Sequence, residues 1–139
     1  MNGERTVTRT VERANQRVRR HLAARLDKLD ITEIEAHLLA RLADKGPCST
    51  ADLQQAFGLR PSTLTNALDR LERRDFLQRR TNPGDRRSFL LALTTTGRKA
   101  ARTVIALVDT LEAEVTARVT TAQLQGFHAV IAALEDSLQ

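Results

Sequence analysis

The feature that most constrains the fold of this chain is a change of hydrophobic period near its middle. Up to about residue 74, apolar side chains recur every three or four positions, which predicts amphipathic helices. From there to residue 93 the period is two, with Phe89, Leu91 and Leu93 on one face of an expected strand, and two helical segments follow. The turn-forming and charged residues of "TNPGDRR" separate two expected strands at 77–80 and 88–93. The sequence therefore predicts a mainly α chain that carries one small β-hairpin.

Cap residues mark the ends of several expected helices. Thr32 followed by Glu35 forms a capping-box pattern, and Ser49 or Thr50 is the expected start of the next, short helix. Gly58 is expected to end that short helix. The expected helices cover about 8–29, 32–46, 49–58, 61–74, 96–119 and 121–138.

The order of the central elements is helix, short helix, helix and hairpin, which is the layout of a winged helix-turn-helix. In this motif the second helix lies in the major groove of double-stranded DNA. The expected organisation is an N-terminal helix at 1–31, a winged helix-turn-helix at 32–95 and C-terminal helices at 96–139.

Positive charge is concentrated in two segments of the chain. The net charge is +5, from 22 Arg and Lys against 17 Asp and Glu. Residues 1–29 carry eight basic against three acidic residues, and residues 60–87 carry eight against four. The remaining segments, 30–59 and 88–139, are slightly acidic. This distribution favours an anionic polymer as partner.

Location can also be predicted from composition. No apolar run is long enough for a transmembrane helix, and the charged N-terminus lacks a signal-peptide core. The single cysteine cannot form an internal disulfide. We therefore expect a cytoplasmic protein with no membrane partner.

The expected helix 61–74 has one apolar face and one polar face. Leu64, Ala67, Leu68 and Leu71 are expected to point inward. On the outer face, hydroxyl groups suit phosphate oxygens, and Asn or Arg can form paired bonds with adenine or guanine. The alternative is a solvated face with an Asp69–Arg73 ion pair. The predicted DNA-binding residues here are Arg60, Ser62, Thr63, Thr65, Asn66, Arg70 and Arg73.

The tip of the expected hairpin carries two arginines that no core packing requires. An arginine at such a tip can enter the negatively charged minor groove. Asp85 could bond the Arg87 guanidinium or the turn amides, and so fix the direction of that side chain. The alternative is a surface salt bridge worth about 0–1 kcal/mol. With a recognition-type helix just before it, we predict that Asp85, Arg86 and Arg87 form a DNA-binding wing.

The segment "STADLQQAFGLRPSTLTNALDRLERRDFLQRRTNPGDRRSFLLALTTTGRKA" resembles the core of the MarR family of bacterial transcriptional regulators. Asp85-Arg86-Arg87 matches the D-x-R wing signature of that family, and "LALTTTGR" follows it as expected. The resemblance covers roughly residues 34–101. It implies that Asp85 braces the wing and that Arg87 enters the minor groove. Asp75 departs from the family, which usually has glycine there, but Asp tolerates a left-handed conformation better than most residues.

The helices at both ends have apolar stripes longer than a small central core can cover. One winged helix makes too few contacts for tight binding, whereas a symmetric dimer contacts two half-sites. The resemblance implies dimerisation through the N- and C-terminal helices. The alternative is that these stripes form intramolecular core. The predicted dimerisation residues are Val11, Val18, Leu22, Leu124, Phe127, Ile131 and Leu134.

Other candidate sites are weaker. Relatives often bind small aromatic effectors, but the chain has no Trp or Tyr, and only His21 and His37 could face such a pocket. No metal-ligand spacing occurs and no cofactor is expected. Cys48 could act as a redox sensor if helix amides lower its pKa, although a buried structural cysteine is the commoner case. The ridge from Arg5 to Arg17 could touch phosphates, bind an anionic effector, or be solvated, which we slightly favour.

These observations predict a homodimeric repressor that binds a pseudo-palindromic operator, with release by a small-molecule effector left open. One alternative is a winged-helix module for protein interaction, without DNA binding. Another is thiol-based regulation through Cys48. An enzyme is excluded by the lack of a phosphate loop, a catalytic triad or a paired-carboxylate pocket.

Overall fold

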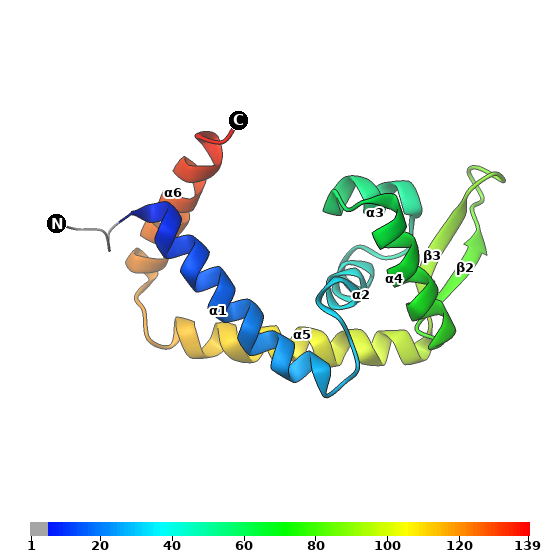
Figure 1. The fold of residues 1–139 in the computed structure, drawn as a ribbon, viewed down its shortest axis with the longest axis horizontal. Helices are drawn as coiled ribbons and strands as arrows, with labels where there is room; N and C mark the ends of the chain where they lie inside the picture. The colour runs from blue at the N-terminus through cyan, green and yellow to red at the C-terminus, as the bar shows by residue number, and fades with distance from the viewer. Residues whose placement is uncertain (1–5) are drawn as a thin grey trace. The chain divides into compact units, whose positions relative to one another are not determined.

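The computed structural model describes residues 6–139, which form six helices and a three-stranded antiparallel sheet (Figure 1). The mainly α fold with a hairpin wing is confirmed, and each expected helix is present with ends within three residues of those predicted. The helices are α1 (Val7–Asp27), α2 (Glu33–Lys45), α3 (Thr50–Phe57), α4 (Pro61–Arg73), α5 (Thr95–Thr116) and α6 (Thr121–Asp136). The strands are β1 (Cys48–Ser49), β2 (Leu77–Thr81) and β3 (Phe89–Leu93).

The chain divides into two compact units, which we describe separately. The winged unit is Leu26–Ala106, and the helical unit is Met1–Arg25 with Leu107–Gln139, described from residue 6 onward. The winged unit thus includes the end of α1 and the first half of α5. Segment boundaries after residues 31 and 95 stay a prediction.

A leucine-rich core holds the winged unit together. Helices α2 and α3 begin where the sequence predicts, because the start of each is capped by a side chain. Thr32 with Glu35 and Ser49 with Asp52 both form complete capping boxes, which assigns the second cap to Ser49. Gly58 ends α3 in the left-handed conformation, with φ of 60°. The residues buried to 1% exposure or less include Leu38, Leu39, Leu53, Leu64, Leu71 and Leu91.

The sheet contains a strand that the sequence does not predict. β1 is two residues long and pairs with β3 through Cys48↔Leu91 and Ser49↔Leu90. The strand order is β1-β3-β2, and β2 and β3 pair from Leu77↔Leu93 to Thr81↔Phe89. A two-residue strand is too short to show an alternating pattern, so only its pairing reveals it.

The end of α4, the end of β3 and the start of α5 meet at one junction. The Thr94 hydroxyl accepts a hydrogen bond from the Gly97 amide at 2.9 Å and donates one to the Asp75 carbonyl. The Thr94 amide donates to the Phe76 carbonyl at 3.1 Å. A Cβ atom on Gly97 would lie 1.9 Å from that same Phe76 oxygen, so only glycine fits there. Asp75 is left-handed, with φ of 59°, as predicted from the missing glycine.

Candidate nucleic-acid interface

Helix α4 presents an exposed polar face, opposite its buried one. All four residues predicted to point inward are buried: Leu64, Ala67, Leu68 and Leu71. Arg60 occupies the N-cap position without a capping side-chain bond, and Pro61 follows it. The amides of the first helical turn can therefore receive a phosphate. The predicted residues that lie exposed on this helix and its cap are Arg60, Ser62, Thr65, Asn66 and Arg73, with Thr63 half-buried.

Arg79 of β2 connects the wing to α4. Its guanidinium donates a hydrogen bond to Asp69 Oδ1 at 3.1 Å, and its Nε lies 3.1 Å from Glu72 Oε2. The two carboxylates lie one helical turn apart, so a single arginine from the strand contacts both. Asp69 therefore has Arg79 as its partner, which differs from the Asp69–Arg73 pair considered from sequence. A shallow hollow beside this contact is lined by Asn66, Asp69, Glu72 and Arg73.

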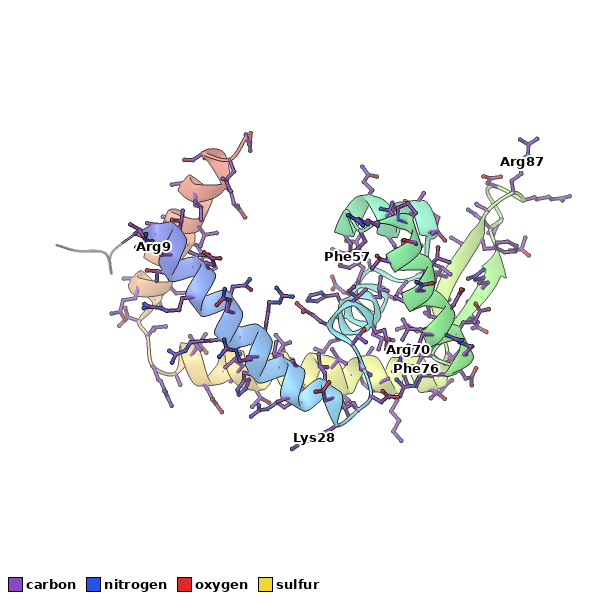
Figure 2. The ribbon with its side chains drawn as sticks, viewed as in Figure 1. Arg9, Lys28, Phe57, Arg70, Phe76 and Arg87 are labelled. Atoms are coloured by element: carbon purple, nitrogen blue, oxygen red, sulfur yellow. The ribbon has the colours of Figure 1, made fainter. Side chains whose placement is uncertain are left out.

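Side-chain bonds to the backbone order the tip of the wing. Asp85 Oδ1 accepts a hydrogen bond from the Arg87 amide at 2.9 Å. Of the two roles predicted for Asp85, this is the bond to a turn amide. Asn82 accepts from the Gly84 amide at 3.0 Å and donates to the Ser88 hydroxyl at 3.0 Å. Arg86 and Arg87 are exposed, and Figure 2 shows Arg87 extending from the tip away from the strands.

Arg70, predicted to contact DNA, is held by two acidic residues. Its Nε lies 2.7 Å from Glu35 Oε1, and its Nη2 lies 2.8 Å from Asp30 Oδ1. The hydrogen bond with Asp30, followed by the charges of Glu35 and Asp30, raises the pKa of Arg70. Glu35 is only 1% exposed, and a buried carboxylate needs a paired cation. Since Arg70 neutralises the buried carboxylate of Glu35, we do not include it among the proposed DNA contacts.

Arg74 strengthens the same corner of the winged unit. It donates hydrogen bonds to the carbonyl of Asp30 and, at 3.2 Å, to that of Leu29. Its guanidinium carbon also lies 4.7 Å from the centre of the Phe76 ring, a cation–π distance. The C-terminal end of α4 thereby fixes the connection between α1 and α2. Sequence reasoning missed this role because the partners lie more than forty residues earlier.

The family of the chain follows from its similarity to known proteins. The profile of the MarR family matches residues 31–89. The transcriptional regulator YwhA of Bacillus subtilis, described as uncharacterized and HTH-type, is 31% identical over 104 residues, which is 75% of each chain. The chain belongs to the MarR family. It is a helix-turn-helix transcriptional regulator of that family, not an enzyme.

Other MarR-family proteins match parts of the chain or its whole fold. The multiple antibiotic resistance protein MarR of Escherichia coli is 32% identical over 89 residues, 64% of this chain and 62% of that protein. The crystal structure of a mutant of E. coli MarR superimposes with a TM-score of 0.78 at 26% identity, covering 96% of this chain and 98% of that one. The MepR–DNA complex of S. aureus gives a TM-score of 0.82 at 23% identity, covering 98% of this chain and all of MepR.

Cys48 of this MarR-family protein does not have the properties of a reactive thiol. Burial is the main cause that raises its pKa, and the charge of Asp52 adds to it, with Arg41 acting in the opposite direction. This shift is opposite in direction to the one that the redox alternative requires. The thiol stays protonated at neutral pH, and the protonated form is not the nucleophile. This argues against thiol-based regulation through Cys48.

The helical unit leaves most of its apolar side chains uncovered. Within the described chain, no residue of α6 is buried, and Phe127 is 55% exposed. Val18 is also exposed, and the other predicted dimerisation residues are half-buried: Val11, Leu22, Leu124, Ile131 and Leu134. A single chain of this protein thus does not bury these stripes as core. Their place in a dimer stays a prediction.

The other residues singled out from the sequence are the arginine ridge of α1 and two histidines. Arg9, Arg13 and Arg17 are exposed on α1, while Arg5 of the same ridge lies outside the described residues. His21 accepts a hydrogen bond from Arg25 at 3.2 Å. The His37 ring stacks on Phe57, with centres 6.4 Å apart.

Two structural findings concern metals and membranes. Among residues 6–139, no cluster of His, Cys, Asp or Glu is arranged to hold a metal ion. None of the helices in that range has the length and apolarity to cross a membrane.

Proposed function

We propose that this protein is a homodimeric repressor that binds a pseudo-palindromic operator in the cytoplasm. One observation carries the proposal: the winged unit exposes both the polar face of α4 and two arginines at a wing tip that the Asp85–Arg87 bond orders. The Arg79 contacts link strand β2 of the wing to α4 and so hold the two elements together. Segment 60–87, which contains both, has eight basic residues against four acidic ones.

The proposed contacts follow from the chemistry of each side chain. Ser62, Thr63 and the first-turn amides of α4 suit phosphate oxygens. Asn66 and Arg73 can form paired hydrogen bonds with adenine and guanine in the major groove. Arg87 is the proposed minor-groove residue. The further proposed contacts are Arg60, Thr65 and Arg86.

Relatives support DNA as the partner. MepR of S. aureus is described in complex with DNA, and NicR of Pseudomonas putida, 36% identical over 67 residues, is described as a transcriptional repressor. NicR matches 48% of this chain and 42% of its own length, so it supports the regulator class rather than a specific operator. The sequence leaves release by a small-molecule effector open, and we propose no residues for it.

In vitro selection from a library of random duplexes tests this proposal. We expect the protein to enrich an inverted repeat whose half-sites lie about 10 base pairs apart, one turn of DNA. Affinity for the selected duplex should fall steeply with salt, because bound phosphates release counterions. If no sequence is enriched, sequence-specific binding is wrong, and the protein-interaction alternative gains support.

The proposed dimer can be tested on α6. Phe127→Asp should raise the dimer dissociation constant by about 30-fold or more, the cost typical of losing a central buried aromatic side chain from an interface. Light scattering over a range of concentrations measures this change. The control is Ala129→Asp, which adds the same charge on the opposite side of the same helix. Equal effects of the two variants would contradict an interface on the Phe127 face.

A further inference from the structure

Phe89, at the outer end of β3, is 56% exposed. Its cross-strand partner is Thr81, at the last pair of the ribbon before the tip. Such a pair stabilises a hairpin only modestly. The proposed arginine contacts give no role to this ring, and a large exposed aromatic group is a common mark of a binding surface.

The register of the hairpin determines which way the ring faces. Side chains of directly paired residues lie on one face of a ribbon, and that face continues at every second residue. Arg79↔Leu91 and Thr81↔Phe89 therefore share a face. Arg79 contacts Asp69 and Glu72, so this is the face turned toward α4. Phe89 therefore lies on the side of the wing that faces α4, closer to the tip than the buried Leu91.

The charges on the same hairpin indicate the partner. Arg86 and Arg87 are exposed at its tip, where a carboxylate oxygen of Asp85 accepts a hydrogen bond from the Arg87 amide. Arg80 is exposed too, but it pairs with Leu90 and so lies on the opposite face from Phe89. An exposed ring at the end of a strand that leads to two tip arginines suits a polyanion that also has apolar surface. DNA provides both, because the deoxyribose groups that border the minor groove expose C–H groups between the phosphates.

We propose that Phe89 packs against a deoxyribose of the operator, at the edge of the minor groove that Arg87 enters. This inference rests on the proposed function and adds to it an apolar contact. The contact contributes affinity but neutralises no phosphate. Loss of the ring therefore weakens binding without changing its salt dependence.

Affinity measurements separate this contact from the ionic ones. On the selected duplex, Phe89→Ala should weaken binding on the order of tenfold for a dimer with two wings. The slope of log affinity against log salt should equal that of the wild type, because no cation is lost. Phe89→Leu should retain most of the affinity. A reduced slope in Phe89→Ala would mean that the ring only positions the wing arginines, and would overturn the proposal.

Fluorescence provides a direct test, because the chain contains no Trp and no Tyr. Phe89→Trp places a single indole at the proposed contact. Adding the selected duplex should reduce quenching of this indole by acrylamide, a neutral quencher that DNA does not repel. The control is Leu138→Trp in the helical unit, at a residue that is 77% exposed and should stay equally open to acrylamide.

The outcomes distinguish the inference from the function on which it rests. If the wild type binds the selected duplex but Phe89→Ala binds equally well, the inference is wrong and the proposed function stands. The same holds if the indole at position 89 stays as accessible to acrylamide as the one at position 138. If selection on the wild type yields no duplex that it binds, both proposals are wrong.

Discussion

Arg87→Ala is expected to weaken binding to the selected operator on the order of 100-fold, since a dimer loses one groove contact from each of two wings. The side chain extends from a tip whose direction is fixed by the 2.9 Å bond from the Arg87 amide to Asp85. Each lost arginine also leaves one phosphate contact unneutralised, so the counterions at that place are not released on binding. The slope of log affinity against log salt should therefore fall by about two per dimer. Fluorescence anisotropy with a labelled duplex, measured at several salt concentrations, checks both quantities.

The matched control is the neighbouring arginine. Arg86→Ala removes the same charge from the same tip, but we assign Arg86 to phosphate or solvent. We expect it to weaken binding by about threefold, as for one rim charge in each wing. Circular dichroism should show an unchanged fold for both variants, because both side chains are exposed. If the two substitutions weaken binding equally, Arg87 has no special place in the minor groove.

Gly97→Ala is expected to destabilise the folded protein by about 3 kcal/mol, at the upper end of the usual cost of overpacking. The added Cβ would lie 1.9 Å from the Phe76 carbonyl oxygen and 2.8 Å from its carbon. The side chain of Phe76 cannot relieve this contact by rotating, because the obstacle is backbone. That oxygen also accepts a hydrogen bond from the Thr94 amide. Urea denaturation, which yields the free energy of unfolding, measures the effect.

Gly126 in α6 provides the control for this substitution. A Cβ atom there would meet nothing within 4 Å. Gly126→Ala should therefore stabilise the protein by roughly 0.5–1 kcal/mol, the usual gain from replacing glycine inside a helix. Gly97 is also helical, so its steric cost must exceed the same gain. If both substitutions stabilise the protein, the close approach at Phe76 is not real.

Local features of the fold could be predicted from the sequence. Capping at Thr32 and Ser49, the inward face of α4 and the left-handed Asp75 each depend on residues within one or two turns of each other. The residues of each such pattern are close together in sequence as well as in space. The two-residue β1 is the exception, because its existence depends on pairing with Leu90 and Leu91.

The candidate site was predictable in outline only. The polar face of α4 and the turn that holds Arg87 follow from spacing and turn chemistry. The ion-pair partners of its charged groups do not follow from spacing, because the fold brings Arg79 and Arg70 close to their carboxylates. Arg70 looks like an outward DNA contact on a helical wheel, yet its acid partners come from before and within α2. The pKa of Cys48 likewise depends on burial, which helix position does not reveal.

The junction at Thr94 and Gly97 limits how this regulator can change its target during evolution. Asp75 and Phe76, just beyond α4, are bonded to Thr94, and Gly97 leaves no free space against Phe76. Helix α4 therefore cannot tilt without displacing the first turn of α5. If α4 reads the operator as proposed, we expect a change of operator to come from exchanging side chains such as Asn66 and Arg73 rather than from a new angle of the helix.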